Sequence, residues 1–247
     1  MIYKEELLRN NYSFEQAELI QIKYQNKIKS IRKEEYISEI KTIKTIAGVD
    51  ISYFYDGNKE NGVACAVLWN LEKKKEEKHC FAQDLIKFPY KSGFLGFREC
   101  KLLFKAIAKL PNSPDLIMCD GHGKIHPRRF GEAVHLGFAL NIPTIGIAKN
   151  PYIGYFNRNE IQKIKGNKAP VWAKDPENID ENSSNELLGY AICLNDGSNP
   201  VFISVGYKTT IDIALKICLI TTKGHRQPEP LYLADHLSRE RTRSYMS

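Results

Sequence analysis

Three apolar, β-branched segments separated by short polar turns lie between residues 45 and 85. They cover residues 45–54, 62–71 and 77–85, and a turn rich in lysine and glutamate at 72–76 joins the last two. Runs of this length and composition predict strands, and such short connections favour antiparallel pairing of neighbours. The sequence therefore predicts an antiparallel three-strand meander in which 45–54 is a central strand.

After residue 88 the pattern changes to alternating helices and strands. A helical spacing of apolar residues begins at 94 and ends before Pro111, followed by a strand at 115–120, a helix at about 129–140 and a strand at 144–148. Strands separated by helices pair in parallel through crossovers. A meander followed by helix, strand, helix, strand is the layout of the ribonuclease H-like fold. We therefore predict an α/β protein with a mixed sheet flanked by helices.

The segments before and after this central part have patterns of their own. Ser13 and Gln16 form a capping-box pattern, which predicts an amphipathic helix ending near Lys33. The polar segment 157–186 is assigned mainly to a loop or insertion. We assign strands to 187–194 and 201–205 and helices to about 210–220 and 231–243. With 247 residues, 43% of them hydrophobic, the chain is expected to form one domain over 1–247.

The composition excludes several classes of protein. The six cysteines show no CxxC spacing, so we interpret them as core residues in a reducing compartment and not as disulfides or a zinc site. No apolar run reaches the length of a membrane span, and the N-terminus does not resemble a signal peptide. We expect a cytoplasmic protein without membrane contact. The net charge of +7 favours polyanionic partners without requiring them.

Three carboxylates fall at matching places in the predicted topology. Asp50 lies on the first strand, Glu99 in the first crossover helix, and Asp120 at the end of the fourth strand. The first and fourth strands are neighbours in this fold, so the three side chains are expected to converge. Carboxylate oxygens suit Mg²⁺ or Mn²⁺, which activate water and neutralise charge on a phosphodiester.

Each of these residues alone has an ordinary structural interpretation. An aspartate at a strand end is often a turn or cap residue, and Glu99 alone fits a solvated helix face. The sequence Asp120-Gly121-His122-Gly123 alone fits a tight turn, and His126 alone fits a hydrogen-bonded structural histidine. The prediction of a catalytic site therefore rests on their joint occurrence in this order.

Several short motifs occur in a fixed order along most of the chain. They are Ala47-Gly48-Val49-Asp50, Phe88-Pro89-Tyr90, Gly93-Phe94-Leu95, Phe97-Arg98-Glu99, Pro114-Asp115-Leu116, Asp120-Gly121-His122-Gly123, His126-Pro127-Arg128-Arg129, Ile142-Pro143-Thr144-Ile145-Gly146, Ala148-Lys149 and Pro228-Glu229-Pro230. This set closely resembles endonuclease V, the deoxyinosine-directed nuclease family, over residues 13–240 except near 157–186.

The resemblance implies a single catalytic domain that acts on inosine, the deamination product of adenosine. It implies a Mg²⁺-dependent endonuclease, with Mn²⁺ able to substitute, that cuts the second phosphodiester on the 3′ side of inosine. The products would carry 3′-hydroxyl and 5′-phosphate ends. The expected partners are inosine-containing DNA or RNA, the expected role is DNA repair or inosine-RNA processing, and a monomer is expected.

The resemblance also assigns roles to residues near the phosphate. Asp50, Glu99 and Asp120 match the metal-binding carboxylates of the family, and Asp235 falls where some members supply a further acid. His126 and Lys149 match residues beside the scissile phosphate. His126 would orient groups or protonate through water, and Lys149 would offset charge in the transition state.

Four further residues match the part of the family that handles the base. Tyr90 matches an aromatic wedge that fills the gap left when the damaged base leaves the stack. Gly93, Leu95 and Gly121 match the pocket that receives the base, where glycine allows close approach of backbone groups.

The sequence departs from the family pattern at a few positions. Lys91 and Ser92 follow Tyr90 where bacterial members usually have an apolar residue and proline. Glu132 stands where an apolar residue beside the pocket is common, and Tyr207 stands where histidine is common. Substrate preference depends most on these positions, and the choice between DNA and RNA stays open.

Two other classes of function remain as alternatives. One is a catalytically silent relative that binds nucleic acid, which the basic charge would suit. The other is a different ribonuclease H-like nuclease, such as a junction resolvase, which would share the acids but lack the wedge and pocket motifs.

Overall fold

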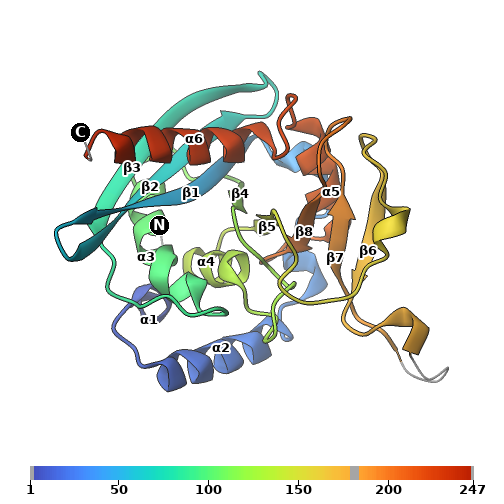
Figure 1. Cartoon of the computed structure of the whole chain (residues 1–247), viewed down its shortest axis with the longest axis horizontal. Coiled ribbons are helices and arrows are strands. Elements are labelled where there is room, and N and C mark those ends of the chain that lie inside the picture. The colour runs from blue at the N-terminus through green and yellow to red at the C-terminus, as the bar shows by residue number, and fades with distance from the viewer. Residues whose placement is uncertain (1–2, 179–183, 246–247) are drawn as a thin grey trace.

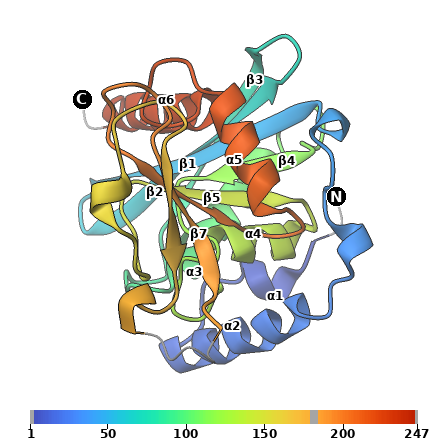
Figure 2. The ribbon, with the colours of Figure 1, turned by 90° about the vertical axis from the view of Figure 1, so that its right-hand side faces the viewer.

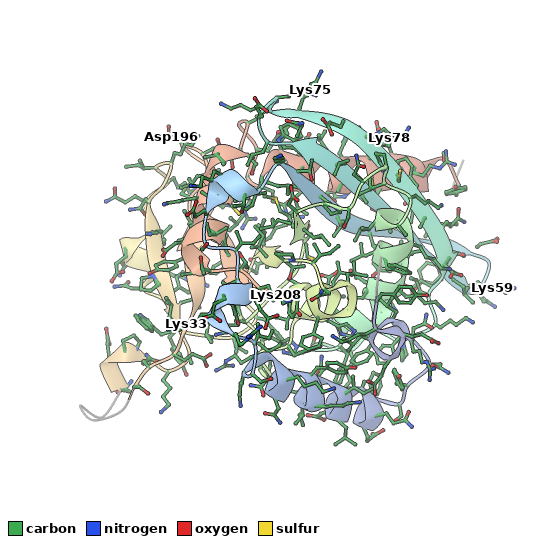
Figure 3. The ribbon with its side chains drawn as sticks, turned by 180° about the vertical axis from the view of Figure 1, so that it is seen from behind. Lys33, Lys59, Lys75, Lys78, Asp196 and Lys208 are labelled. Atoms are coloured by element: carbon green, nitrogen blue, oxygen red, sulfur yellow. The ribbon has the colours of Figure 1, made fainter. Side chains whose placement is uncertain are left out.

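The structure is a computed structural model that describes residues 3–178 and 184–245, and in this part of the chain eight strands form one sheet. The strand order is β3-β2-β1-β4-β5-β8-β7-β6 (Figure 1). Strands β1 (Thr45–Asp56), β2 (Lys59–Asn70) and β3 (Lys75–Leu85) pair antiparallel, which confirms the predicted meander. Figure 3 shows Lys75 and Lys59 at opposite ends of this meander, where β3 begins and β2 begins.

Two crossovers then add parallel strands. Helix α3 (Leu95–Ile107) leads to β4 (Leu116–Cys119), and helix α4 (Glu132–Leu140) leads to β5 (Thr144–Ala148). Strand β4 lies parallel between β1 and β5. The prediction that the first and fourth strands are neighbours is therefore confirmed, and with it the ribonuclease H-like order.

The other half of the sheet is antiparallel. Strand β8 (Val201–Val205) pairs with β5, β7 (Leu187–Ile192) pairs with β8, and β6 (Lys168–Trp172) forms the edge. Strand β6 lies within the segment 157–186, most of which was assigned to a loop, and residues 179–183 lie outside the described residues. In β6 the side chains alternate, with Ala169 and Val171 buried, and the proline between them is compatible with an edge strand.

Helices cover both faces of the sheet. Helices α1 (Glu5–Leu8), α2 (Phe14–Ile28), α3 and α4 cover one face, and α5 (Ile211–Ile220) and α6 (Glu229–Arg243) cover the other (Figures 1 and 2). Alternate residues of β1 enter the two cores, since Ala47 and Val49 pack with α1 to α4 and Ile46 packs with α5. Short 3₁₀ helices occupy Lys33–Glu35, Ile40–Thr42, Arg158–Glu160 and Pro176–Asn178.

Two predicted helix ends were wrong for local reasons. The capping box of Ser13 and Gln16 is present, but α2 ends at Ile28, and the hydroxyl of Ser30 donates to the Lys27 carbonyl at 2.7 Å where the helix stops. Helix α4 begins at Glu132 and not near Arg129, because Arg129 has a φ of 54°, which is left-handed backbone.

The absence of disulfides is confirmed, since all six cysteines have free thiols. Within residues 3–178 and 184–245, no helix combines the length and the apolar character needed to cross a membrane.

Candidate active site

Four carboxylates named in the sequence analysis come together around the end of β4. Asp120 is the residue after β4, and Asp50 is the β1 residue directly after the last pair with that strand. Since the β1–β4 pairing stops there, side chains can approach from both faces of the sheet. Asp235 comes from α6 on one face, and Glu99 comes from α3 on the other.

The electrostatics show that these four residues, hereafter the acid cluster, influence one another. The pKa of Asp50 is raised well above its ordinary value, first by burial and then by repulsion from Asp120, Asp235 and Glu99. A hydrogen bond with Asp235 raises it further. The structure therefore brings the predicted acids into one cluster of like charges.

Lys149 reaches this cluster from the residue directly after β5. Its Nζ donates to Oδ2 of Asp120 at 2.9 Å and lies 3.8 Å from Oδ2 of Asp235. Burial alone would lower the pKa of Lys149, but attraction to Asp120, Asp235 and Asp50 outweighs it and the pKa is raised. Lys149 is therefore cationic and offsets part of the negative charge.

Glu99 is held by a tyrosine that the sequence analysis missed. The hydroxyl of Tyr53, on β1, donates to Oε1 of Glu99. Burial raises the pKa of Glu99 to about 7, although hydrogen bonds with Tyr53 and Glu132 act in the opposite direction. In the sequence, the available signal for Tyr53 was its position three residues after Asp50, which places it on the opposite face of the same strand.

Glu132 is a further acid next to the cluster. It is the first residue of α4 and is buried, and its Oε2 has no hydrogen-bond partner among the described residues. Burial, followed by the charge of Glu99, raises its pKa well above the ordinary value. In the sequence Glu132 was only a departure from the family pattern, because its buried position depends on how α4 packs.

The donor chemistry of the cluster fits a hard divalent cation. Its side chains offer carboxylate oxygens alone, which Mg²⁺ and Mn²⁺ prefer, and burial combined with mutual repulsion favours a bound positive charge. As the side chains stand, no three His, Cys, Asp or Glu residues of the described chain converge as metal ligands. Asp120 and Asp235 face Lys149 instead, and Arg239 pairs with Asp235 at 2.7 Å.

The raised pKa of Glu99 predicts how the metal-free protein responds to pH. Between the ordinary value of 4.5 and about 7, folded Glu99 holds a proton that the unfolded chain releases, so stability falls as pH rises through this window. In chelator, we expect the melting temperature to drop by several degrees from about pH 5 to about pH 8, because each kcal/mol lost from the free energy of unfolding lowers it by about 2–4 °C. Glu99→Gln should flatten this decline, whereas Glu34→Gln, at an exposed position, should not. A melting temperature that rises over this range would contradict the assignment.

A pocket lies beside the acid cluster, and all of the predicted base-binding residues except Gly121 line it. Tyr90, Gly93 and Leu95 line it together with Glu132 and Tyr152, and its volume is about 200 Å³. This is smaller than the roughly 300–1,000 Å³ of sites for drug-sized molecules, and it suits a single flat ring system. Gly121 lies behind Glu132, so it shapes the pocket through that side chain.

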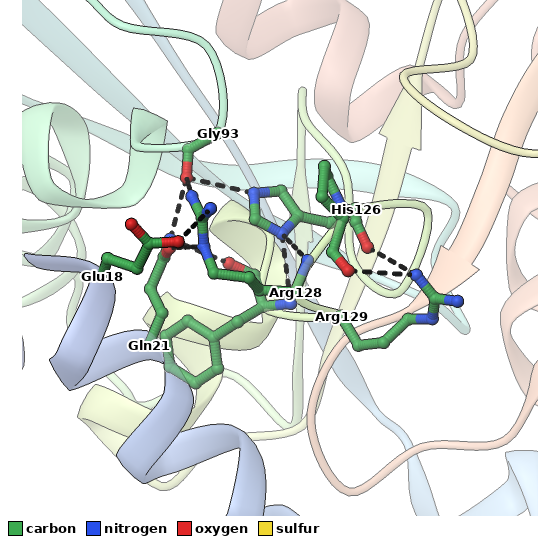
Figure 4. A network of polar contacts seen from close by, with 8 residues as sticks. Glu18, Gln21, Gly93, His126, Arg128 and Arg129 are labelled. Carbon is green, nitrogen blue, oxygen red and sulfur yellow. Dashed lines mark hydrogen bonds and ion pairs between the residues drawn. The ribbon is translucent and has the colours of Figure 1, made fainter.

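Gly93 is the centre of the polar network that holds the pocket loop (Figure 4). It has a φ of 86°, a conformation that favours glycine. Its carbonyl accepts hydrogen bonds from His126 Nε2 at 3.1 Å, from Arg128 at 3.1 Å and from Gln21 Nε2 at 2.9 Å. Glu18 also pairs with Arg128 at 3.1 Å, so two residues of α2 support the loop.

The structure places His126 in the wall of this pocket. Its Nδ1 accepts from the backbone N–H groups of Arg128 and Phe130 at 3.2 and 3.4 Å, so the ring proton lies on Nε2 and points to the Gly93 carbonyl. Burial lowers the pKa of His126 to about 4. His126 is therefore a neutral hydrogen-bond donor near pH 7 that fixes the position of Gly93.

Two tyrosines line the pocket. Tyr90 is 72% exposed. Tyr152 has its ring centre 5.6 Å from that of His126 and 6.0 Å from that of His122. Tyr152 was not predicted from the sequence, although its position three residues after Lys149, in the loop that follows β5, was an available signal.

The contact between Gly121 and Glu132 makes a testable prediction. A Cβ atom at residue 121 would lie 2.1 Å from Oε2 of Glu132. Gly121→Ala should therefore displace Glu132 and cost about 1–3 kcal/mol, the usual range for overpacking. The double variant Gly121→Ala with Glu132→Ala removes the obstructing atoms. Its loss in the free energy of unfolding should therefore be smaller than the sum of the losses of the two single variants. Strictly additive effects on the free energy of unfolding would show that the two residues do not compete for this space.

Several known proteins are similar to this chain. A family model described as endonuclease V matches residues 25–236. Endonuclease V of Roseiflexus castenholzii is 34% identical over 196 residues, which cover 79% of this chain and 81% of the relative. The crystal structure of endonuclease V from Streptomyces avermitilis matches with a TM-score of 0.81 at 31% identity, covering 96% of each chain. Endonuclease V of Ciona intestinalis, solved with a 24mer DNA containing an inosine followed by a ribo-adenosine, matches with a TM-score of 0.78 at 29% identity, covering 92% of this chain and 97% of the other.

Proposed function

Because the chain belongs to the endonuclease V family and is a nuclease, we propose that it recognises inosine in DNA or RNA and hydrolyses the second phosphodiester on the 3′ side. The products carry 3′-hydroxyl and 5′-phosphate ends, the metal is Mg²⁺ with Mn²⁺ as a substitute, and the protein acts as a monomer. The complex of the Ciona intestinalis relative with inosine-containing DNA supports this substrate.

One observation carries the proposal: the base-sized pocket and the acid cluster share a wall. Glu132 lines the pocket, and its carboxyl interacts with those of Glu99, Asp50 and Asp120. A base held in the pocket therefore places its own strand beside the cluster. An enzyme that recognises one base and cuts nearby requires this arrangement.

The residues divide the chemistry between them. Asp50, Glu99, Asp120 and Asp235 would hold the metal, which when bound would activate water and neutralise phosphate charge. Lys149, already directed at Asp120, supplies a fixed positive charge for the charge that develops on the phosphate.

The pocket residues bind and orient the base. His126 acts as a positioning residue, because its neutral ring holds the Gly93 carbonyl. Gly93 and Leu95 give the base access to backbone groups, and Gly121 shapes the pocket through Glu132. Tyr90 fills the gap left in the strand.

The products provide the test of the reaction. A 5′-labelled single strand with one inosine, prepared as DNA and as RNA, should yield a fragment ending one nucleotide beyond the inosine. The 3′ fragment should be ligatable because of its 5′-phosphate. A cut at the first phosphodiester, or 5′ to the inosine, would exclude the proposed reaction, and the ratio of the two rates determines the preference for DNA or RNA.

The wedge role of Tyr90 predicts a difference between duplex and single strand. Only in the duplex must the enzyme compensate for unstacking and unpairing, which costs a few kcal/mol, and an aromatic platform typically provides about 1–3 kcal/mol per base. Tyr90→Ala should therefore lower affinity for inosine in a duplex by about tenfold or more, with a smaller loss in a single strand. Equal losses on both substrates together with a lowered melting temperature would show that Tyr90 only packs the loop.

A further inference from the structure

A second concave surface includes Lys149, which contacts the acid cluster. This groove has a volume of about 370 Å³, and four cations line it: Lys149, Arg158, Lys163 and Arg226. The part of its lining that the structure describes contains no Asp or Glu. Lys149 pairs with Asp120, whereas the other three cations form no ion pair with a described acid. A cluster of positive charge of this kind attracts a polyanion.

The cations of this groove differ in their structural duties. Nη2 of Arg226 donates to the Lys149 carbonyl at 2.5 Å and to the Pro200 carbonyl at 2.7 Å. Arg226 thereby fixes the loop that carries Lys149. Arg158 and Lys163 are exposed, and no described acid forms an ion pair with either of them. Their charges are therefore available to a ligand.

The floor of the groove is apolar and aromatic. Phe156 packs edge-on against Phe202 with ring centres 5.2 Å apart, and the Arg158 guanidinium lies 5.7 Å from the Phe156 ring centre. Phe156 stays partly exposed. Cations beside a supported aromatic ring match a nucleotide, since phosphates pair with the charges while a base or sugar contacts the ring.

The position of the groove identifies which nucleotides it holds. Glu132 joins the base pocket to the acid cluster, and Lys149 joins the cluster to the groove. A hydrogen bond also connects the two hollows, since Nε2 of His122 in the pocket donates to the carbonyl of Asn150 in the groove at 2.9 Å. A strand that leaves the pocket and passes the cluster therefore continues into the groove.

We propose that this groove binds the single-stranded nucleotides on the 3′ side of the scissile phosphate, with Arg158 and Lys163 contacting their phosphates. The proposal rests on the proposed function, which places the cut 3′ to the inosine. It gives the polar segment that begins at 157 a role in binding the leaving part of the strand.

Binding of two single-stranded DNAs tests the groove separately from the base pocket. Both carry one inosine and the same 5′ portion. The short strand ends at the first nucleotide beyond the scissile phosphate, and the long strand continues for about four more, enough to reach several phosphates. Binding is measured in chelator, so that neither strand is cut, for the wild type and for Arg158→Ala with Lys163→Ala. The control is Lys165→Ala with Lys216→Ala, which removes the same charge from exposed positions outside the groove.

The wild type should bind the long strand about tenfold more tightly than the short one. The groove variant should lose most of this ratio. For the long strand, the slope of log affinity against log salt concentration should become shallower by about 1.4, because each of the two lost phosphate contacts contributes about 0.7 on a single strand. The control variant should keep the ratio. An unchanged ratio in the groove variant, or equal losses on both strands, would overturn the groove assignment.

An adenosine version of the short strand separates the two proposals. If the wild type prefers inosine there but gains nothing from the 3′ extension, the groove proposal fails and the proposed function stands. If the wild type shows no preference for inosine, the proposed function fails and the groove proposal fails with it.

Discussion

Replacement of Asp120 by alanine is expected to abolish cleavage while inosine-strand binding stays measurable. Loss of residues that merely orient metal ligands typically costs about 10–100-fold, so loss of a ligand should cost more, at least about 10³-fold in rate. Binding should persist because it comes mainly from the pocket and from phosphate contacts. Rate and affinity are measured on the same single-stranded inosine substrate.

The stability of the Asp120→Ala protein provides a control for folding. Asp120 contributes to the raised pKa of Asp50 through repulsion, so its removal relieves one unfavourable interaction. Removal also breaks the ion pair with Lys149, which opposes this relief, so the melting temperature in chelator should change little. Asp50→Ala should lose activity in the same way. Cleavage by Asp120→Ala above trace levels would remove this residue from the catalytic centre.

Lys149→Ala is expected to lower turnover at saturation by about 10²–10³-fold, the range for one group that stabilises developing charge. The ammonium already lies 2.9 Å from Asp120, within reach of a phosphate bound at the cluster. A group that acts mainly in the transition state changes turnover more than affinity. Lys149→Arg, which keeps the charge but alters its geometry, should recover only part of the rate.

Separate measurements of turnover and affinity distinguish the two roles of Lys149. If Lys149 is only a phosphate anchor, affinity and overall efficiency will fall equally while turnover at saturation stays unchanged. His126→Ala should also lower turnover, but through the pocket loop, because the His126 ring bonds the Gly93 carbonyl.

The strand order explains why the acids could be predicted from the sequence. Three strands with short turns followed by alternating helices and strands allow few topologies, and in this one the first and fourth strands are neighbours. Asp50 and Asp120 then have to lie close together. Their convergence follows from backbone topology, which hydrophobic patterns encode well.

The surroundings of the acids depend on packing and could not be predicted in the same way. Tyr53 donates a hydrogen bond to Glu99, and Glu132 is buried against Gly121. Both contacts exist because α3 and α4 pack on this face of the sheet. The sequence pattern of Glu132 alone fits an exposed helix start. The left-handed backbone of Arg129 and the short edge strand β6 were likewise determined by tertiary context.

Inosine-directed cleavage is tested by comparing two strands that differ at one base. The wild-type protein is incubated with matched single strands containing inosine or adenosine, with Mg²⁺ and with chelator. We expect cutting of the inosine strand at the second 3′ phosphodiester in Mg²⁺, only trace cutting of the adenosine strand, and no cutting in chelator. Equal cutting of both strands in Mg²⁺ would indicate a ribonuclease H-like nuclease without base recognition, and inosine-selective binding without cutting would indicate a silent relative; either result would contradict the account.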